Sequence, residues 1–232
     1  DITQQLQLLE KIDHKKESLS LDLEIGSPNT NFKLDNNFFE RGDAEIYYSM
    51  IRYYKPKKIL EIGSGFSTLI ALEANKKNNS NAIIKCIEPY ENPWLENYDI
   101  NLIRKKIEEI DFENEINLEA NDILFIDTSH IIRPEGDVLK IFHEILPILN
   151  KGVIIHIHDI FTPFNYPSAW IKKENRFWNE QYLLESLLDN SKRYSVLCSL
   201  NYLKNEKYNE LNKICPYLKK ESMPGSFYLK VN

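Results

Sequence analysis

The stretch Lys58-Ile-Leu-Glu-Ile-Gly-Ser-Gly-Phe-Ser-Thr-Leu-Ile70 combines a short apolar run with two closely spaced glycines. The apolar run is typical of a strand buried in a parallel sheet. Gly63-Ser-Gly65 predicts a turn in which the backbone can approach a ligand closely. Ser67 and Thr68 are good N-cap residues for a helix that follows the turn. A strand, a glycine turn and a helix are the entry to a nucleotide-binding βαβ unit.

Two common phosphate-binding motifs do not fit this turn. A P-loop needs a lysine directly after its second glycine, and none follows here. A dinucleotide fingerprint needs a third glycine three residues after Gly65, where this chain has Thr68. Glu61 near the strand end would repel a pyrophosphate and suits a cationic ligand better. The alternative is an ordinary strand, turn and helix without a ligand.

A second strand pattern ends in an acid. Ala82-Ile-Ile-Lys-Cys-Ile-Glu88 is rich in β-branched residues. Glu88 lies about 20 residues after the turn, where nucleotide-binding α/β folds carry a carboxylate for the ribose hydroxyls. A carboxylate can accept hydrogen bonds from two neighbouring hydroxyls at once. Taken alone, Glu88 is better explained as a strand end that meets water, but the spacing favours ribose binding.

The pattern Glu61-x-Gly63-x-Gly65 resembles the first motif of class I S-adenosylmethionine-dependent methyltransferases. The resemblance covers nearly the whole chain, from about Asp43 to Val231. It implies that S-adenosylmethionine is the cofactor, with Glu61 near its methionine end and the glycines beneath it. Ser67 stands where the family commonly has a third glycine. The cofactor-binding residues implied in this way are Glu61, Gly63, Gly65, Ser67, Thr68 and Glu88.

Strand and helix patterns alternate along the rest of the chain, which predicts a doubly wound α/β fold. Further strands are expected within 102–110 and at 122–127, 153–158, 194–199 and 226–231, and helices at 43–54, 137–149, 182–188 and 208–218. The resemblance implies seven strands in a mostly parallel sheet, with the last strand antiparallel. We expect residues 1–42 to form an N-terminal helix to about Lys16 and a connecting segment, with a short strand pattern at 19–25. Residues 43–232 are expected to form the methyltransferase domain, and 161–179 a long aromatic loop.

Polar residues follow two later strands, at Asp127-Thr-Ser-His130 and His158-Asp159. Because carboxyl ends of parallel strands meet at one rim, we expect these side chains near the cofactor. They resemble the site of metal-dependent sugar O-methyltransferases of the macrocin and mycinamicin type. That resemblance implies Asp127, His158 and Asp159 as ligands of a divalent cation, magnesium or manganese. It also implies His130 as the catalytic base, with Asp127 as the other catalytic residue.

One position departs from that pattern, because those enzymes carry an acid where this chain has His158. An imidazole suits manganese, iron, nickel or zinc better than magnesium. The departure also leaves open that no metal binds. For His130 the alternative is a structural histidine, and His156, one strand repeat deeper, is predicted to be a hydrogen-bonded core histidine.

The segments 159–170 and 176–182 resemble a bacterial group known as methyltransferase family 24. Their aromatic rings can stack on the apolar face of a sugar, and Arg133 or Arg176 can hold an anionic group. A loop packed by its own aromatic residues is an equally good explanation.

Composition excludes several classes of protein. The 232 residues carry a formal net charge of −6 with a pI of about 5.5, and no basic run offers a footprint for nucleic acid. No apolar run is long enough to span a bilayer and no signal-peptide pattern is visible, so we expect a cytoplasmic protein without a membrane partner. Its expected partner is a small-molecule acceptor, and a homo-oligomer is left open. The widely spaced Cys86, Cys198 and Cys215 are expected to be reduced thiols.

The function predicted from the sequence is O-methylation of a small hydroxylated metabolite or sugar by S-adenosylmethionine. Two alternatives stay open at this point. One is a nicotinamide-dependent oxidoreductase on a related fold, against which the missing third glycine and Glu61 count. The other is a noncatalytic or hydrolytic relative that uses His158 and Asp159 for a metal.

Overall fold

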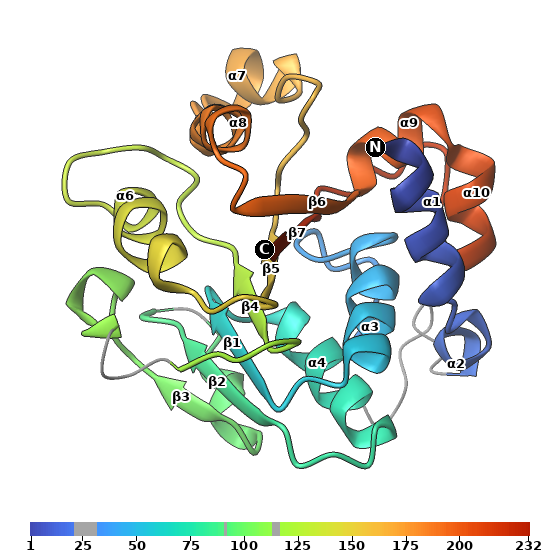
Figure 1. Cartoon of the computed structure of the whole chain (residues 1–232), viewed down its shortest axis with the longest axis horizontal. Helices are drawn as coiled ribbons and strands as arrows, with labels where there is room; N and C mark the ends of the chain where they lie inside the picture. Colours follow the sequence, from blue (N-terminus) through green and yellow to red (C-terminus); the bar gives the residue numbers. More distant parts are fainter. Residues whose placement is uncertain (21–31, 91, 113–116) are drawn as a thin grey trace.

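A computed structural model describes residues 1–20, 32–90, 92–112 and 117–232. Its centre is a seven-stranded sheet in the order β3-β2-β1-β4-β5-β7-β6 (Figure 1). The strands are β1 (Lys58–Ile62), β2 (Ile83–Ile87), β3 (Asn101–Ile103), β4 (Ile123–Ile126), β5 (Ile154–Ile157), β6 (Tyr194–Ser199) and β7 (Phe227–Val231). Neighbours pair in parallel except β7, which lies antiparallel between β5 and β6. The predicted doubly wound, mostly parallel sheet is confirmed.

Helices cover both faces of this sheet. One face packs against α1 (Ile2–Lys11), α3 (Asp43–Tyr54), α4 (Phe66–Lys77), α9 (Leu200–Glu206) and α10 (Tyr208–Ile214). The other face packs against α6 (Asp137–Lys140), the turns η3 (Ile141–Ile145) and η4 (Leu146–Ile148), and α8 (Glu180–Asn190). The remaining helical elements are α2 (Lys15–Ser20), α7 (Ser168–Glu174), η1 (Pro93–Asn97) and η2 (Ile107–Glu109).

The central strands read as continuous apolar runs because both of their faces are buried. In β1, Ile59 and Glu61 point toward α3 and α4, while Leu60 and Ile62 join the core on the α6 side. All four residues of β4 and all four of β5 are buried. Polar groups are therefore gathered at the carboxyl ends of the strands, which is where an open α/β sheet binds its ligands.

The N-terminal residues form two helices where the sequence predicted one. Helix α1 ends at Lys11, and α2 begins at Lys15. Leu8, Leu9 and Ile12 join the core on the α3 side, and the Gln5 side chain accepts a hydrogen bond from the Ser199 amide at 2.9 Å. The predicted strand at 19–25 lies outside the described residues except for its first two, which belong to α2. The domain boundary near residue 42 stays a prediction.

Two other predictions were wrong in detail. The aromatic segment 161–179 contains helix α7, which has no buried residue and therefore shows no apolar period in the sequence. The helix predicted at 137–149 was expected to be kinked or to end near Pro147, and the 3₁₀ turn η4 lies there. The unpredicted part is that the segment is α-helical only over its first turn and continues as the π-helical η3. Proline lacks the amide hydrogen that an α-helix would need at this point.

Among the described residues, none of the helices has both the length and the apolar character needed to cross a bilayer.

Candidate active site at the carboxyl ends of the strands

The glycine turn joins the ends of three strands. Gly63 has φ +82°, and a Cβ there would lie 1.7 Å from the Asp127 carbonyl oxygen. The Gly63 amide donates to the Ile87 carbonyl at 2.9 Å, and the Asp127 amide donates to the Ile62 carbonyl at 2.8 Å. The first glycine is therefore required by the close approach of β1 to the end of β4. Gly65 is extended, and a Cβ there would meet only the Asn92 side chain, at 2.9 Å.

Helix α4 begins two to three residues earlier than the sequence predicted. Its N-cap is Gly65, and neither Ser67 nor Thr68 takes that position. The fully buried Thr68 hydroxyl accepts from the Gly65 amide at 3.2 Å and donates to the Glu61 carboxylate. Thr68 thus supports the turn from below, and a contact of Thr68 with the cofactor stays a prediction. Ser67 does line the cavity above the turn.

Glu61 is fully buried beneath the turn. Besides Thr68, its carboxylate accepts from the Tyr47 hydroxyl at 3.1 Å and contacts the Cys86 thiol at 3.8 Å. Burial raises the pKa of Glu61 to about 7, and these donors oppose the shift. The carboxylate thus supports the turn from inside the domain, and a direct contact with the cofactor stays a prediction.

Glu88 lies between two cavities at the rim of the sheet. We call the cavity of about 440 Å³ above Gly63–Ser67 the turn hollow, and that of about 390 Å³ beside Tyr90 and Ile107 the Tyr90 hollow. Both hollows are lined in part by Gly63, Glu88, Asp127 and Thr128. The mostly buried Glu88 carboxylate accepts from the amides of Ser64 and Tyr90, each at 3.1 Å. The predicted cofactor residues other than Glu61 and Thr68 therefore line one continuous region.

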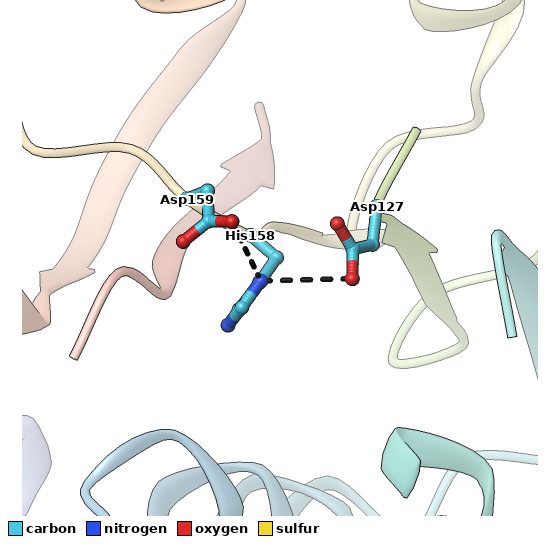
Figure 2. A group of neighbouring side chains, drawn as sticks. All are labelled: Asp127, His158 and Asp159. Atoms are coloured by element: carbon cyan, nitrogen blue, oxygen red, sulfur yellow. Dashed lines mark ion pairs between the residues drawn. The ribbon is translucent and has the colours of Figure 1, made fainter. Parts of the chain in front are cut away.

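Asp127, His158 and Asp159 form a cluster at the end of β4 and β5 (Figure 2). Their ligand atoms lie within 4.8 Å of one another. The His158 Nδ1 atom is 3.6 Å from Asp127 Oδ2 and 3.7 Å from Asp159 Oδ2. Burial would lower the pKa of His158, but the two carboxylates outweigh it and hold that pKa well above its usual value. Burial would raise the pKa of Asp127, but His158 and His130 keep it well below its usual value.

This cluster has the character of a cation site. His158 is almost fully buried, yet within the described residues neither of its ring nitrogens has a hydrogen-bond partner. The distances to the carboxylates are too long for hydrogen bonds, and they are short enough for one small ion to contact all three donors. Two carboxylates and an imidazole suit manganese, iron or zinc. The residues present therefore fit a divalent metal.

Asp43 supports His158 from behind, although the sequence analysis gave it no role at this site. Its Oδ2 lies 3.7 Å from His158 Nε2, and its carboxylate accepts from the amides of Gly225 and Ser226. The cap of α3 is Gly42, one residue earlier. Asp43 thus links the turn before β7 to the histidine of the cluster.

His130 lies beside the cluster, where the sequence predicted it. Its Nε2 is 3.1 Å from Asp127 Oδ1 and 3.8 Å from Asp159 Oδ2, and its Nδ1 is 2.9 Å from Glu180 Oε2. Burial alone would lower the pKa of His130, but the carboxylates of Asp127 and Glu180 raise it to about 10. In this arrangement the ring is protonated at neutral pH. It can accept a proton only once Asp127 has turned its oxygen to another partner.

The sequence analysis missed one residue of this site and correctly set another aside. Glu180 lies within the segment 176–182 and was given no role, although it is fully buried against His130. The helix was predicted to begin only at residue 182, whereas α8 begins at Glu180, so the sequence analysis did not place this acid in its first turn. His156 is fully buried, with its Nε2 2.7 Å from the Ser226 hydroxyl and its ring against Tyr228. The core-histidine prediction for His156 is confirmed.

The two arginines considered for an anionic group lie in different places. Arg133 forms ion pairs with Glu108 and Asp137 and lines the Tyr90 hollow. Arg176 lies between the rings of Trp170 and Trp178, at 4.9 and 5.2 Å, and lines the turn hollow. Each arginine shares a hollow with the cluster, Arg133 with Asp127, and Arg176 with Asp127 and Asp159.

Comparison with known proteins agrees with this geometry. Residues 60–160 match a family described as a methyltransferase domain, methyltransferase family 24. An uncharacterized protein of Archaeoglobus fulgidus is 39% identical over 95 residues, which cover 38% of this chain and 43% of that protein. The match thus spans less than half of the relative's length.

Solved structures resemble the chain over nearly its whole length. The S-adenosylhomocysteine-bound Podospora anserina methyltransferase PaMTH1 is 18% identical with a TM-score of 0.55, covering 94% of this chain and 95% of its own. The plantazolicin methyltransferase BpumL with S-adenosylhomocysteine is 14% identical with a TM-score of 0.52, covering 98% and 95%. CmcI with magnesium and S-adenosylmethionine is 13% identical with a TM-score of 0.51, covering 89% and 79%. At these identities the likeness concerns the fold. The chain thus has the fold of these S-adenosylmethionine-dependent methyltransferases, and its residues 60–160 are similar to the methyltransferase domain of family 24.

Proposed function

We propose that this protein transfers the methyl group of S-adenosylmethionine to a hydroxyl oxygen of a small acceptor, a sugar or a similar hydroxylated metabolite. The observation that carries the proposal is the cluster of Asp127, His158 and Asp159 at the edge of the turn hollow. A cofactor above the glycine turn would bring its methyl group close to these groups. Because Asp159 lines both the turn hollow and a neighbouring cavity beside Trp170, one side chain can face cofactor and acceptor together.

The reaction is an in-line displacement at the sulfonium. The acceptor oxygen forms a bond to the methyl carbon, and the carbon–sulfur bond breaks with its electron pair going to sulfur. The acceptor loses its proton, and the products are a methyl ether and S-adenosylhomocysteine. The donor is already activated, so the protein must mainly hold the oxygen in line and receive the proton.

The cofactor is assigned to the two hollows on either side of Glu88. Glu88 is the ribose-binding group in this assignment, and Tyr90 and Ile107 offer an apolar wall for the adenine in the Tyr90 hollow. The methionine portion lies in the turn hollow above Gly63 and Gly65. Relatives of the same fold bind S-adenosylmethionine or its product, which supports this choice of ligand.

The acceptor is assigned to a third cavity, which we call the Trp170 hollow. It measures about 520 Å³ and is lined by Asp43, His158 and Asp159 together with the apolar side chains of Phe38, Trp170 and Met223. It shares Asp159 and Arg176 with the turn hollow. Aromatic rings that can stack on a sugar therefore surround the groups that would face its hydroxyl.

A divalent cation held by Asp127, His158 and Asp159 would lower the pKa of the acceptor hydroxyl and orient it. The imidazole ligand favours manganese over magnesium. His130 receives the acceptor proton in this proposal, because its Nε2 faces the cluster. Once Asp127 turns to the acceptor or the cation, the contact that keeps the His130 pKa high is weakened.

A cytoplasmic location, the absence of a nucleic-acid partner and a homo-oligomeric state remain predictions.

The cofactor assignment predicts that S-adenosylhomocysteine binds and that Glu88→Gln weakens binding by about 1.5–3 kcal/mol, the usual value of hydrogen bonds to a charged group. Glutamine keeps an acceptor for only one of the amides of Ser64 and Tyr90, so the melting temperature of the variant is measured beside its affinity. Isothermal calorimetry on the two proteins measures the difference. The matched control is Glu119→Gln, an exposed glutamate distant in sequence from the turn, which should bind as the unchanged protein does. Binding of NAD in place of S-adenosylhomocysteine, or unchanged affinity in Glu88→Gln, would contradict the assignment.

The cation assignment predicts that manganese binds and that Asp159→Asn weakens it about 10-fold or more, because a charged oxygen ligand is lost. Electron paramagnetic resonance of added manganese measures the bound fraction. Asp189→Asn, at an exposed position of α8, removes the same charge away from the cluster and should change nothing. Equal manganese binding in both variants would contradict the metal site. The proposal would then rest on direct contact of the acceptor with Asp127 and Asp159.

A further inference from the structure

Glu180 is a buried carboxylate that the proposed reaction does not use. It is the first residue of α8 and is completely inaccessible to solvent. Its Oε2 lies 2.9 Å from the Nδ1 atom of His130, and within the described residues its Oε1 has no hydrogen-bond partner. A carboxylate without full hydrogen bonding is costly to bury, so simple packing at this position would favour an apolar residue or an amide.

The backbone around Glu180 holds His130 in a fixed place. The amides of Asn179 and Glu180 donate to the His130 carbonyl at 2.9 and 3.3 Å. The Asn179 side chain in turn accepts from the Ile132 amide at 2.6 Å. These hydrogen bonds hold the start of α8 against the loop after β4, which also carries Asp127.

The ring of His130 is fixed on three sides. Glu180 holds Nδ1, the Trp178 ring lies against the imidazole at a centroid distance of 4.2 Å, and Asp127 Oδ1 faces Nε2 at 3.1 Å. The backbone of His130 has φ +57°, a conformation that costs energy for any residue with a side chain. These contacts together determine which nitrogen faces the cluster.

An ionised carboxylate can only accept hydrogen bonds. The hydrogen between Glu180 and His130 must then sit on Nδ1. Nε2 becomes the nitrogen that faces Asp127 and Asp159, where the acceptor hydroxyl would lie. The carboxylate therefore selects both the orientation of the ring and the nitrogen available at the site.

We propose that Glu180 is a positioning residue for methyl transfer, which holds the Nδ1–H of His130 and directs Nε2 toward the acceptor oxygen. The inference rests on the proposed function, because it gives His130 a task in that reaction. Glu180 itself does not touch cofactor or acceptor. Its effect passes through the imidazole.

Three variants of the full chain test this role. Glu180→Ala removes the acceptor for Nδ1–H, Glu180→Gln keeps an uncharged acceptor of the same length, and Asp189→Asn is the control on the same helix. Proton NMR of protein with ¹⁵N-labelled histidine observes the Nδ1–H of His130 directly, and only five histidines contribute. The signal is assigned by its absence from His130→Asn.

The unchanged protein and Asp189→Asn should show a slowly exchanging Nδ1–H signal shifted far downfield by the carboxylate. Glu180→Ala should lose it, and Glu180→Gln should keep a weaker, less shifted signal. A signal that is the same in Glu180→Ala as in the unchanged protein would overturn the proposal. So would the absence of the signal from the unchanged protein. Melting temperatures of all variants separate unfolding from local loss of the hydrogen bond.

Methyl transfer supplies the second measurement. Radioactive methyl transfer from S-adenosylmethionine to a panel of hydroxylated sugars and phenols gives kcat. We expect kcat to fall about 10- to 100-fold in Glu180→Ala, as for other residues that orient a histidine, with partial recovery in Glu180→Gln and an unchanged KM for S-adenosylmethionine. Equal kcat in all variants would overturn the role. If the unchanged protein methylates no acceptor while the NMR signal responds as expected, the proposed function fails and Glu180 is shown to orient His130 only.

Discussion

Gly63→Ala should prevent the protein from folding stably, because the added Cβ has no space. It would lie 1.7 Å from the carbonyl oxygen of Asp127, a backbone atom that cannot rotate away, and φ +82° is itself unfavourable for alanine. We expect a loss of about 4 kcal/mol or more in the free energy of unfolding, a size reached only by severe core disruptions. Urea unfolding followed by circular dichroism measures this loss in the free energy of unfolding. A variant that cannot be obtained as folded protein would also agree with the prediction.

Gly65→Ala is the matched control, two residues away in the same turn. Its backbone is extended, which alanine adopts freely, and the nearest atom to a new Cβ is the Asn92 side-chain nitrogen at 2.9 Å. That side chain can move at the cost of its hydrogen bond to the Ser64 carbonyl, about 1 kcal/mol. Equal destabilisation by the two substitutions would show that Gly63 is not held by its approach to β4.

The contrast between the glycines shows what the sequence predicted and what it did not. The sequence predicted a turn with close backbone approach, and it did so correctly because glycine permits such approaches. It predicted that the backbone of the turn approaches a ligand. At Gly63, however, the backbone approaches the main chain of Asp127, 64 residues later in the sequence. Contacts between residues far apart in sequence depend on strand order, which a local motif does not contain.

The residues at the carboxyl ends of the strands could be predicted from the sequence, because the order of an apolar run followed by polar residues is visible there. Asp127, His158 and Asp159 each end a strand with a clear apolar run, and parallel strands bring their carboxyl ends together. Thr68 and Glu180 were not predictable in the same way. The direction of each side chain depends on where a helix begins. The N-cap of α4 lies two residues before Ser67, the first of the predicted caps, and the Thr68 hydroxyl faces Glu61.

His130→Asn should reduce methyl transfer about 10²- to 10⁴-fold, the usual contribution of a general base. Asparagine is chosen because it tolerates φ +57° better than alanine does, so a change in activity will not simply report backbone strain. Affinity for S-adenosylhomocysteine should change far less than turnover, because Glu88 and the glycine turn, to which cofactor binding is assigned, stay unchanged although His130 lines the same hollow. Turnover with the identified acceptor and calorimetry on the same preparation provide both quantities.

The pH dependence of this variant separates a base from a structural residue. Carboxylates on both sides raise the pKa of His130 to about 10, so the ring must lose its contact with Asp127 before it can accept a proton near neutral pH. If His130 is that acceptor, raising the pH should partly restore the Asn variant, because hydroxide can take the proton instead. His143→Asn, at an exposed position, should keep full turnover at every pH. A His130→Asn protein with a lower melting temperature but full activity per folded molecule would make His130 a structural residue. The proton would then have to leave to Asp127 or to water.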